Sequence, residues 1–194
     1  MTLPLAALLF GGCFLAGDRL SRLAGHGDSM GAERVVFGAA TGLAAAAFLI
    51  FLLALLGVLY PFTGWILLFG FYALGTSTLR QEGRNWLQKW RGLPRLAAGE
   101  LCNRGWASVW YWTLGILFFL GLILAQAPPT RQDTLVYHLA VPRAYLEAHG
   151  LTNLPNNKYS FLPLFTEMIY LWAMTFQVEP LPQVMGFGSP AFIL

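Results

Sequence analysis

The chain consists of long apolar stretches separated by short segments that carry all of its charges. The three longest uncharged stretches are Met1–Gly17, Val35–Leu79 and Gly105–Thr130. A transmembrane helix needs about 20 predominantly apolar residues, so the first and third stretches each suit one span and the middle one suits two. The pattern predicts an all-α, polytopic transmembrane protein.

The first apolar segment, Thr2–Ala16, predicts a short span rather than a signal peptide, because no Lys or Arg precedes it. Arg19 and Arg22 follow it, and positive charges tend to stay in the cytoplasm. We therefore expect the N-terminus outside the cell and the loop after this span inside it.

The middle stretch is interrupted by Pro61, which predicts spans near Val35–Tyr60 and Phe62–Thr78 joined as a hairpin. The first of these contains the spacing Gly38-x-x-x-Gly42, followed one turn later by Ala46. Small residues at this spacing allow two membrane helices to approach closely. Chance in a helix rich in glycine and alanine explains the spacing equally well.

The segment 79–105 is the most basic part of the chain, with six of its twelve Lys and Arg residues. It predicts a cytoplasmic loop with a helix lying on the membrane surface. The next span, Trp106–Ala127, then runs outward. Residues 1–127 are thus predicted to form a transmembrane region of about four helices.

Residues 128–162 predict an external loop with two juxtamembrane helices. Asp133 is suited to cap the first, which ends before Pro142. Pro142 is suited to open the second, which Gly150 stops. The remaining part, 163–194, predicts a helix re-entering the membrane over Leu164–Val178 and the start of an unfinished span, Val184–Leu194.

Composition supports a membrane class and excludes several others. Hydrophobic residues make up 57% of the chain and charged residues only 11%, against about 25% in soluble domains. The net charge of +3 is explained by the basic loops, so no nucleic-acid partner is predicted. Membrane lipids are the predicted partners. Two cysteines form no disulfide framework, and no Cys/His cluster suggests a metal site.

The residues that could carry chemistry lie in and just after the external loop. Asp133 comes six residues after Ala127, which places its carboxylate near the membrane surface. Tyr137 is one helical turn away on the same face, whereas His138 is about 140° around the helix. Taken alone, an Asp at this place is most often a helix cap, and core packing is an alternative explanation for His138.

Four further residues complete the candidate set. Arg131, Arg143 and Lys158 are suited either to hold a substrate phosphate or to anchor the chain to lipid headgroups. Glu167 falls in the first turns of an apolar helix, where the helix dipole favours an acid. Because a charge facing lipid is costly, we expect Glu167 to point into the protein or a cavity.

The strings Gln132-Asp-Thr-Leu-Val-Tyr-His-Leu-Ala-Val-Pro-Arg-Ala-Tyr145 and Leu154-Pro-Asn-Asn-Lys-Tyr-Ser-Phe-Leu-Pro-Leu-Phe-Thr-Glu-Met-Ile-Tyr170 together resemble part of a known superfamily. It is the GT-C membrane glycosyltransferases, in particular bacterial proteins similar to dolichyl-phosphate-mannose-protein mannosyltransferases. In that superfamily an acidic residue opens the first large external loop, juxtamembrane helices follow, and a proline-led helix returns into the membrane. The resemblance covers about residues 128–183.

This resemblance implies transfer of a sugar from a polyprenyl-phosphate donor to a lipid, glycan or protein acceptor on the outer face of a bacterial inner membrane. Asp133 would be the general base or a ligand to a divalent cation. Arg131, Arg143 or Lys158 would stabilise the leaving phosphate. Tyr137, His138 and Glu167 would contact or orient the acceptor or the acid.

The chain also departs from the family pattern. Such transferases have many more spans, and their loop follows the first span, whereas three spans precede the one that leads into this loop. We therefore expect an N-terminal portion or a truncated form of a transferase. The alternative is a small non-enzymatic membrane protein, such as an assembly or anchoring subunit. A transporter or channel fragment is disfavoured because Glu167 is the only ionisable residue predicted within the membrane.

Overall fold

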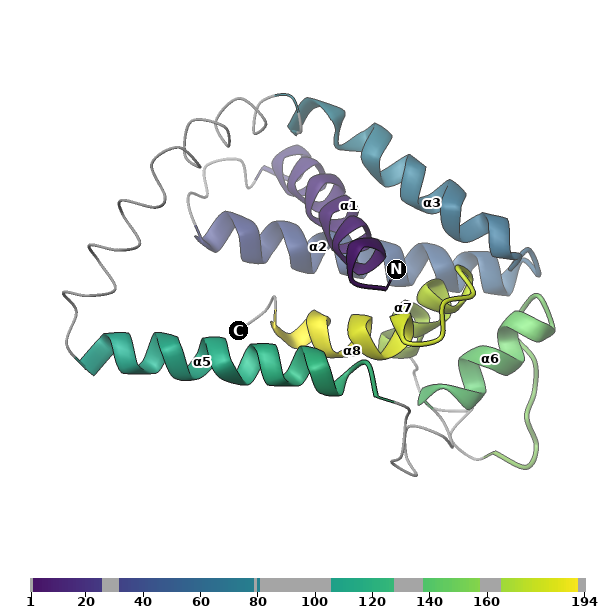
Figure 1. Ribbon diagram of the computed structural model, residues 1–194. Coiled ribbons are helices and arrows are strands. Elements are labelled where there is room, and N and C mark those ends of the chain that lie inside the picture. Colours follow the sequence, from purple (N-terminus) through teal and green to yellow (C-terminus); the bar gives the residue numbers. More distant parts are fainter. Residues whose placement is uncertain are drawn as a thin grey trace.

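The computed structural model describes residues 2–25, 32–78, 80, 106–127, 138–157 and 165–191, and these parts contain helices and no strand (Figure 1). The all-α prediction is therefore confirmed. The named helices are α1 (Thr2–Leu23), α2 (Ala32–Leu55), α3 (Pro61–Leu74), α5 (Trp106–Leu124), α6 (Ala140–Glu147), α7 (Phe165–Met174) and α8 (Leu181–Ala191).

Helices α1 and α2 pack closely through glycines. A β-carbon added to Gly17 of α1 would overlap the backbone of Gly38 and Gly42, and one added to Gly42 would overlap the carbonyl of Cys13. Ala46 of α2 is fully buried. The close approach predicted from the Gly38 and Gly42 spacing is thus confirmed, with α1 as the partner helix.

Helix α1 is longer than the predicted span Thr2–Ala16, because it continues through Asp18 and Arg22 to Leu23. The charges do not end the helix because the Asp18 carboxylate is compensated within the fold. Its partners include the guanidinium of Arg34 at the start of α2.

The break between α2 and α3 involves two residues rather than Pro61 alone. Gly57 adopts a positive φ of 71° just after α2 ends, a conformation that suits glycine. Pro61 is then the first residue of α3. Contrary to a simple hairpin, α3 packs mainly on α1, where the Tyr72 hydroxyl donates a hydrogen bond to the Leu8 carbonyl (2.9 Å).

Helix α7 lies at the centre of the core and contacts α2, α3, α6 and α8. Its Trp172 is fully buried, and the indole Nε1 donates to the carbonyl of Gly64 in α3 (3.2 Å). The ring of Trp172 also meets Phe71 edge to face, with 5.8 Å between centroids. These contacts hold α7 in place and so fix the residues on its first turns.

Helices α6, α7 and α8 differ in extent from their predictions. Helix α6 begins two residues before Pro142, and proline is tolerated there because it lies in the first turn. Helix α7 ends at Met174 rather than Val178, and Gln177 just after it has a positive φ of 57°. Helix α8 begins at Leu181, three residues before the predicted start of the last span at Val184, and is described to Ala191.

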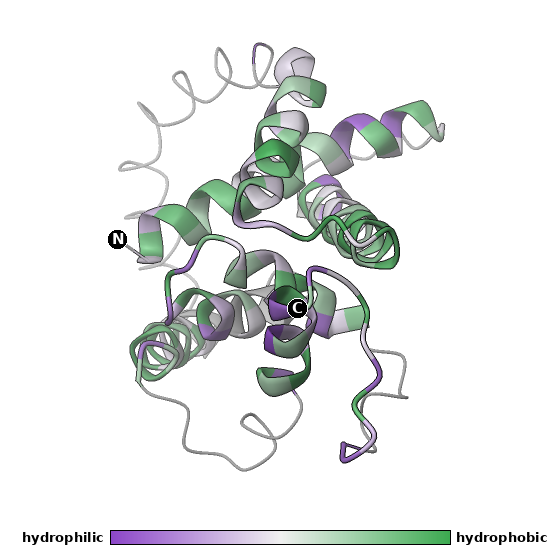
Figure 2. Cartoon of the chain, turned by 90° about the vertical axis from the view of Figure 1, so that its right-hand side faces the viewer, coloured by the Kyte–Doolittle hydropathy of each residue, from purple (hydrophilic) through white to green (hydrophobic). Residues whose placement is uncertain are grey.

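Two helices, Thr2–Leu23 and Glu33–Leu55, are long and apolar enough to cross a membrane, while Pro61–Leu74 and Trp112–Leu124 are apolar but shorter. Hydrophobic colours cover most of the helices, whereas hydrophilic colours concentrate near helix ends and in the 138–157 region (Figure 2). The surface helix predicted in 79–105 and the first juxtamembrane helix predicted after Ala127 lie outside the described residues.

Helix α5 matches the predicted span Trp106–Ala127, ending three residues earlier at Leu124. It packs against α8 (Figure 1). Leu122 packs against the core. Eleven other large apolar side chains are between 41% and 72% exposed: Val109, Trp110, Trp112, Leu114, Ile116, Leu117, Phe118, Phe119, Leu120, Ile123 and Leu124. Helix α5 is thus apolar over nearly all of its described surface.

Candidate functional site

Two of the predicted site residues, His138 and Glu167, form a pair. Nδ1 of His138 lies 2.7 Å from Oε1 of Glu167. The Glu167 residue is 5% exposed, whereas the His138 side chain is 32% exposed. An ionised carboxylate can only accept hydrogen bonds, so Nδ1 carries the proton when Glu167 is ionised, and Nε2 is the nitrogen that can act toward another group.

The pair is positioned by the start of α7. Glu167 lies in the first turn of α7, where the helix dipole stabilises a negative charge. Tyr170 follows one turn later, and its ring is 6.0 Å from that of His138. A β-carbon at Gly186 of α8 would overlap the Tyr170 hydroxyl, so glycine at position 186 leaves room for this tyrosine.

Helix α6 is attached to the rest of the fold at both ends. Before its first residue, His138 binds Glu167 of α7. After its last residue, the His149 ring donates from Nδ1 to the Leu59 carbonyl (2.8 Å) and stacks on Tyr60 with 4.2 Å between centroids. The two histidines therefore link α6 to α7 at one end and to the turn between α2 and α3 at the other.

The inward face of α6 adds packing to these attachments. Val141 and Pro142 are fully buried and Tyr145 is 5% exposed. Burial raises the pKa of Tyr145 above its ordinary value, so its phenol stays protonated at neutral pH. Held by its ends and by this face, α6 provides a rigid wall beside the His138 and Glu167 pair.

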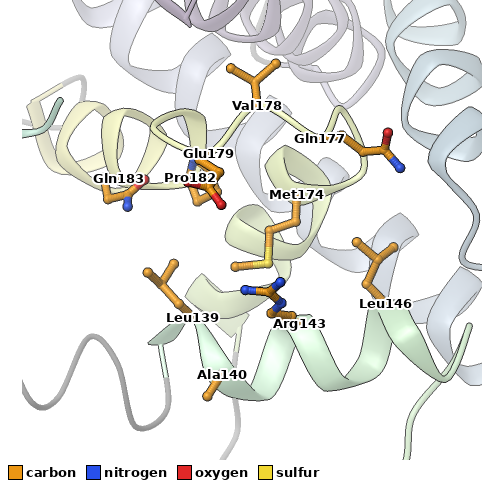
Figure 3. Close-up of a pocket in the computed structure, with 10 residues that line it drawn as sticks. All are labelled: Leu139, Ala140, Arg143, Leu146, Met174, Gln177, Val178, Glu179, Pro182 and Gln183. Carbon is orange, nitrogen blue, oxygen red and sulfur yellow. The ribbon is translucent and has the colours of Figure 1, made fainter. Parts of the chain in front are cut away.

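A pocket of about 510 Å³ opens between α6 and the turn that joins α7 to α8 (Figure 3). Leu139, the residue directly after His138, is part of its lining. The wall is largely apolar but includes one cation, one acid and two amides. The lining residues are Leu139, Ala140, Arg143, Leu146, Met174, Gln177, Val178, Glu179, Pro182 and Gln183.

Arg143 is the predicted phosphate ligand that this pocket contains. In the close-up view its guanidinium lies across the pocket near Met174, opposite Glu179 and Gln183 (Figure 3). Arg143 also pairs with Glu147 on its own helix at 3.3 Å, with both side chains more than 70% exposed. Ion pairs this exposed contribute little, so Arg143 is able to turn toward a ligand.

The other predicted site residues, Asp133, Arg131, Tyr137 and Lys158, lie outside the described residues. The structure therefore brings His138 and Glu167 together, places Arg143 in the adjoining pocket, and leaves the role of Asp133 a prediction. Glu167 points into the protein as expected. Within the described ranges, no group of three or more His, Cys, Asp or Glu side chains is arranged to hold a metal ion.

Sequence reasoning missed Tyr170 and the polar side of the pocket. The spacing of Tyr170 three residues after Glu167 was available as a signal, since residues at that spacing share a helix face. Gln177, Glu179 and Gln183 gave no comparable signal, because they come together only through the turn between α7 and α8.

The His138 and Glu167 pair should be energetically coupled. Removing His138 leaves the buried Glu167 carboxylate without this hydrogen bond, which we expect to cost about 1–3 kcal/mol of unfolding free energy; removing Glu167 should cost less, because His138 is partly exposed. The double variant His138→Ala/Glu167→Ala should cost less than the sum of the singles. Thermal or denaturant unfolding of the purified chain measures this cycle. The exposed Arg143 and Glu147 pair is the matched control, with coupling of about 0–1 kcal/mol; equal coupling in both pairs would contradict the assignment.

Comparisons with protein families, curated proteins and solved structures find no match to this chain. The chemistry of the site is therefore inferred from its own residues. They offer a buried acid bound to an imidazole, a cation and an amphipathic pocket. These groups suit the orientation of a polar, phosphate-bearing or hydroxylated molecule beside an apolar surface.

Proposed function

We propose that the chain is a membrane glycosyltransferase of the GT-C type, or a portion of one. It would transfer a sugar from a polyprenyl-phosphate donor to a lipid, glycan or protein acceptor on the outer face of a bacterial inner membrane. The observation that carries the proposal is the pair of His138 and the buried Glu167. His138 comes five residues after Asp133, and the next residue, Leu139, lines the pocket that contains Arg143.

The membrane part of the proposal is supported by what the helices expose. A core helix of a soluble protein buries its apolar side chains, but α2 exposes Phe48 and Leu55 by more than half, and eleven large apolar side chains of α5 are at least 41% exposed. A helix that is apolar on all sides is stable when buried or in a bilayer. Such an apolar surface is compatible with the acyl chains of a lipid bilayer.

The chemistry proposed for the site follows from its polar groups. As the acceptor hydroxyl oxygen attacks the anomeric carbon, Asp133 would remove its proton, and the bond from that carbon to the phosphate oxygen would break. Arg143, with Arg131 or Lys158, would stabilise the departing polyprenyl phosphate by charge. His138, fixed by Glu167, would orient the acceptor or the acid, with Tyr137 as a further contact. The alternative role for Asp133 is that of a ligand to a divalent cation.

A transfer assay tests this function directly. Membranes from cells producing the chain are incubated with radiolabelled polyprenyl-phosphate sugars, and the label is followed into lipid, glycan and protein fractions. The proposal expects label in one of these fractions above that of membranes without the chain. If no donor gives transfer while the chain is present in the membrane, the non-enzymatic assembly or anchoring protein becomes the better interpretation.

The proposed topology makes a separate prediction. In intact cells, a thiol reagent that cannot cross membranes should label an Asn156→Cys variant, because residue 156 is exposed and belongs to the external loop. Cys102, in the predicted cytoplasmic loop, should react only after the cells are permeabilised. Mass spectrometry of the labelled chain measures both sites. Labelling of Cys102 in intact cells would overturn the orientation, and the buried Cys13 serves as the unreactive reference.

A further inference from the structure

The end of α1 contains a buried carboxylate shared between three parts of the fold. Asp18 is 2% exposed. Arg34 of α2 donates to both of its oxygens, and Nε of Arg22 lies 3.0 Å from Oδ2. The Thr78 hydroxyl, in the helical turn after α3, also donates to Oδ2 at 3.0 Å. The carboxylate therefore accepts hydrogen bonds from α2 and from the turn after α3, and forms an ion pair within α1.

Three arginines lie near this end of the fold, at the end of α1 and the start of α2. One carboxylate, Asp18, serves two guanidiniums, those of Arg22 and Arg34. Arg19 adds a third guanidinium three residues before Arg22, a spacing that places the two side chains as neighbours on the helix surface. The exposed Glu33 at the start of α2 is the one further acid that α1 and α2 carry. Within α1 and α2, three arginines therefore stand against two acids, and the segment that joins the two helices adds Asp28.

Apolar side chains lie beside these arginines and face outward. Leu23 and Phe37 are 66% and 50% exposed, and Val35 is 43% exposed. The hydrophilic positions of α1 are confined to its last turns, while the rest of the helix is mainly hydrophobic (Figure 2). An arginine cluster bordering exposed apolar side chains matches a phosphate attached to acyl chains, since basic pockets between membrane helices bind acidic headgroups.

We propose that Arg19 and Arg22 bind the phosphate of an acidic phospholipid, with Arg34 behind them held in place by Asp18. The lipid belongs to the leaflet in which α1 ends, the cytoplasmic one in the proposed topology. This site rests on the membrane placement of α1 and α2 in the proposed function. A phospholipid rather than free phosphate is the occupant because Leu23, Val35 and Phe37 supply the surface for its acyl chains.

The test compares lipids on the purified full chain in mild detergent. Adding phosphatidylglycerol at ten times its Kd should raise the midpoint of thermal unfolding by about 3–6 °C, and the same mole fraction of phosphatidylcholine should leave it unchanged. Arg19→Gln should remove the increase. This arginine takes part in no ion pair among the described residues, so the lipid-free midpoint should stay the same. The control Arg143→Gln, on α6, should keep the increase.

Three outcomes would overturn the site: an equal increase with phosphatidylcholine, a full increase in Arg19→Gln, or the same increase with inorganic phosphate alone. The last would indicate an anion site without a lipid. Alkaline carbonate extraction separates these results from failure of the membrane proposal. A chain that stays in carbonate-washed membranes but does not discriminate the two lipids removes only the lipid site. A chain that is washed out removes the membrane placement itself.

Discussion

Replacing Asp133 by Asn should lower sugar transfer by about 100- to 10,000-fold, the contribution typical of a general base. The amide has nearly the same shape as the carboxylate but does not accept a proton at neutral pH. Proton removal from the acceptor hydroxyl would then be lost while binding of donor and acceptor is retained. The loss should therefore appear in kcat more than in KM. Transfer of radiolabelled sugar by membranes containing equal amounts of chain measures both constants.

A matched acid on α6 provides the control for this variant. Glu147 is exposed, pairs only weakly with Arg143 and is not assigned a role in transfer. Glu147→Gln removes the same charge and should leave the transfer rate within about twofold, as expected for a surface substitution. Normal transfer by Asp133→Asn, or an equal loss in Glu147→Gln, would remove the role given to Asp133.

Gly42→Ala should have the largest effect on stability. The added methyl group would overlap the carbonyl of Cys13, with the Cα of Cys13 only 2.9 Å away. Both sides of this contact are helix backbone, so rotating a side chain cannot relieve it and the helices must separate. Overpacking of this kind costs about 1–3 kcal/mol or more. Lower thermal midpoint and earlier denaturant unfolding of the purified chain in detergent are the expected readouts.

Gly70→Ala on α3 is the matched control for the glycine contact. A β-carbon at Gly70 has no neighbouring atom within 4 Å, and alanine is favoured over glycine in helix interiors by about 1 kcal/mol. The control should therefore be neutral or slightly stabilised. If Gly42→Ala is as stable as Gly70→Ala, α1 and α2 do not approach each other at Gly42 in the way described.

The extent of the helices was predictable where local pattern decides it, and less so where distant contacts do. The apolar run around Pro61 gave two helices, as predicted. The end of α1 was placed seven residues too early because its charges looked like the end of a span. They are accommodated by Arg34, sixteen residues after Asp18, and no local pattern reveals such a contact. Similarly, the end of α2 is set by the positive φ of Gly57.

The site was predictable in part, for a related reason. The burial of Glu167 followed from the cost of exposing a charge to lipid, a property of that residue and its own helix. Its partner His138 lies 29 residues away in sequence, well beyond the spacing of three or four residues that links side chains within a helix. The sequence therefore identified each residue as a candidate, but it did not predict that the two would form a pair. Asp133 stays a prediction because it lies outside the described residues.

The two histidine attachments fix the length of the segment that contains α6. His138 and His149 are eleven residues apart, and each is bound to a different part of the fold. Inserting or deleting one residue between them would rotate one histidine about the helix axis by about 100° relative to the other. It would also shift that histidine along the axis by about 1.5 Å. In related sequences this interval should keep its length. Gains and losses of residues should fall instead in 151–157, where the chain has no regular secondary structure.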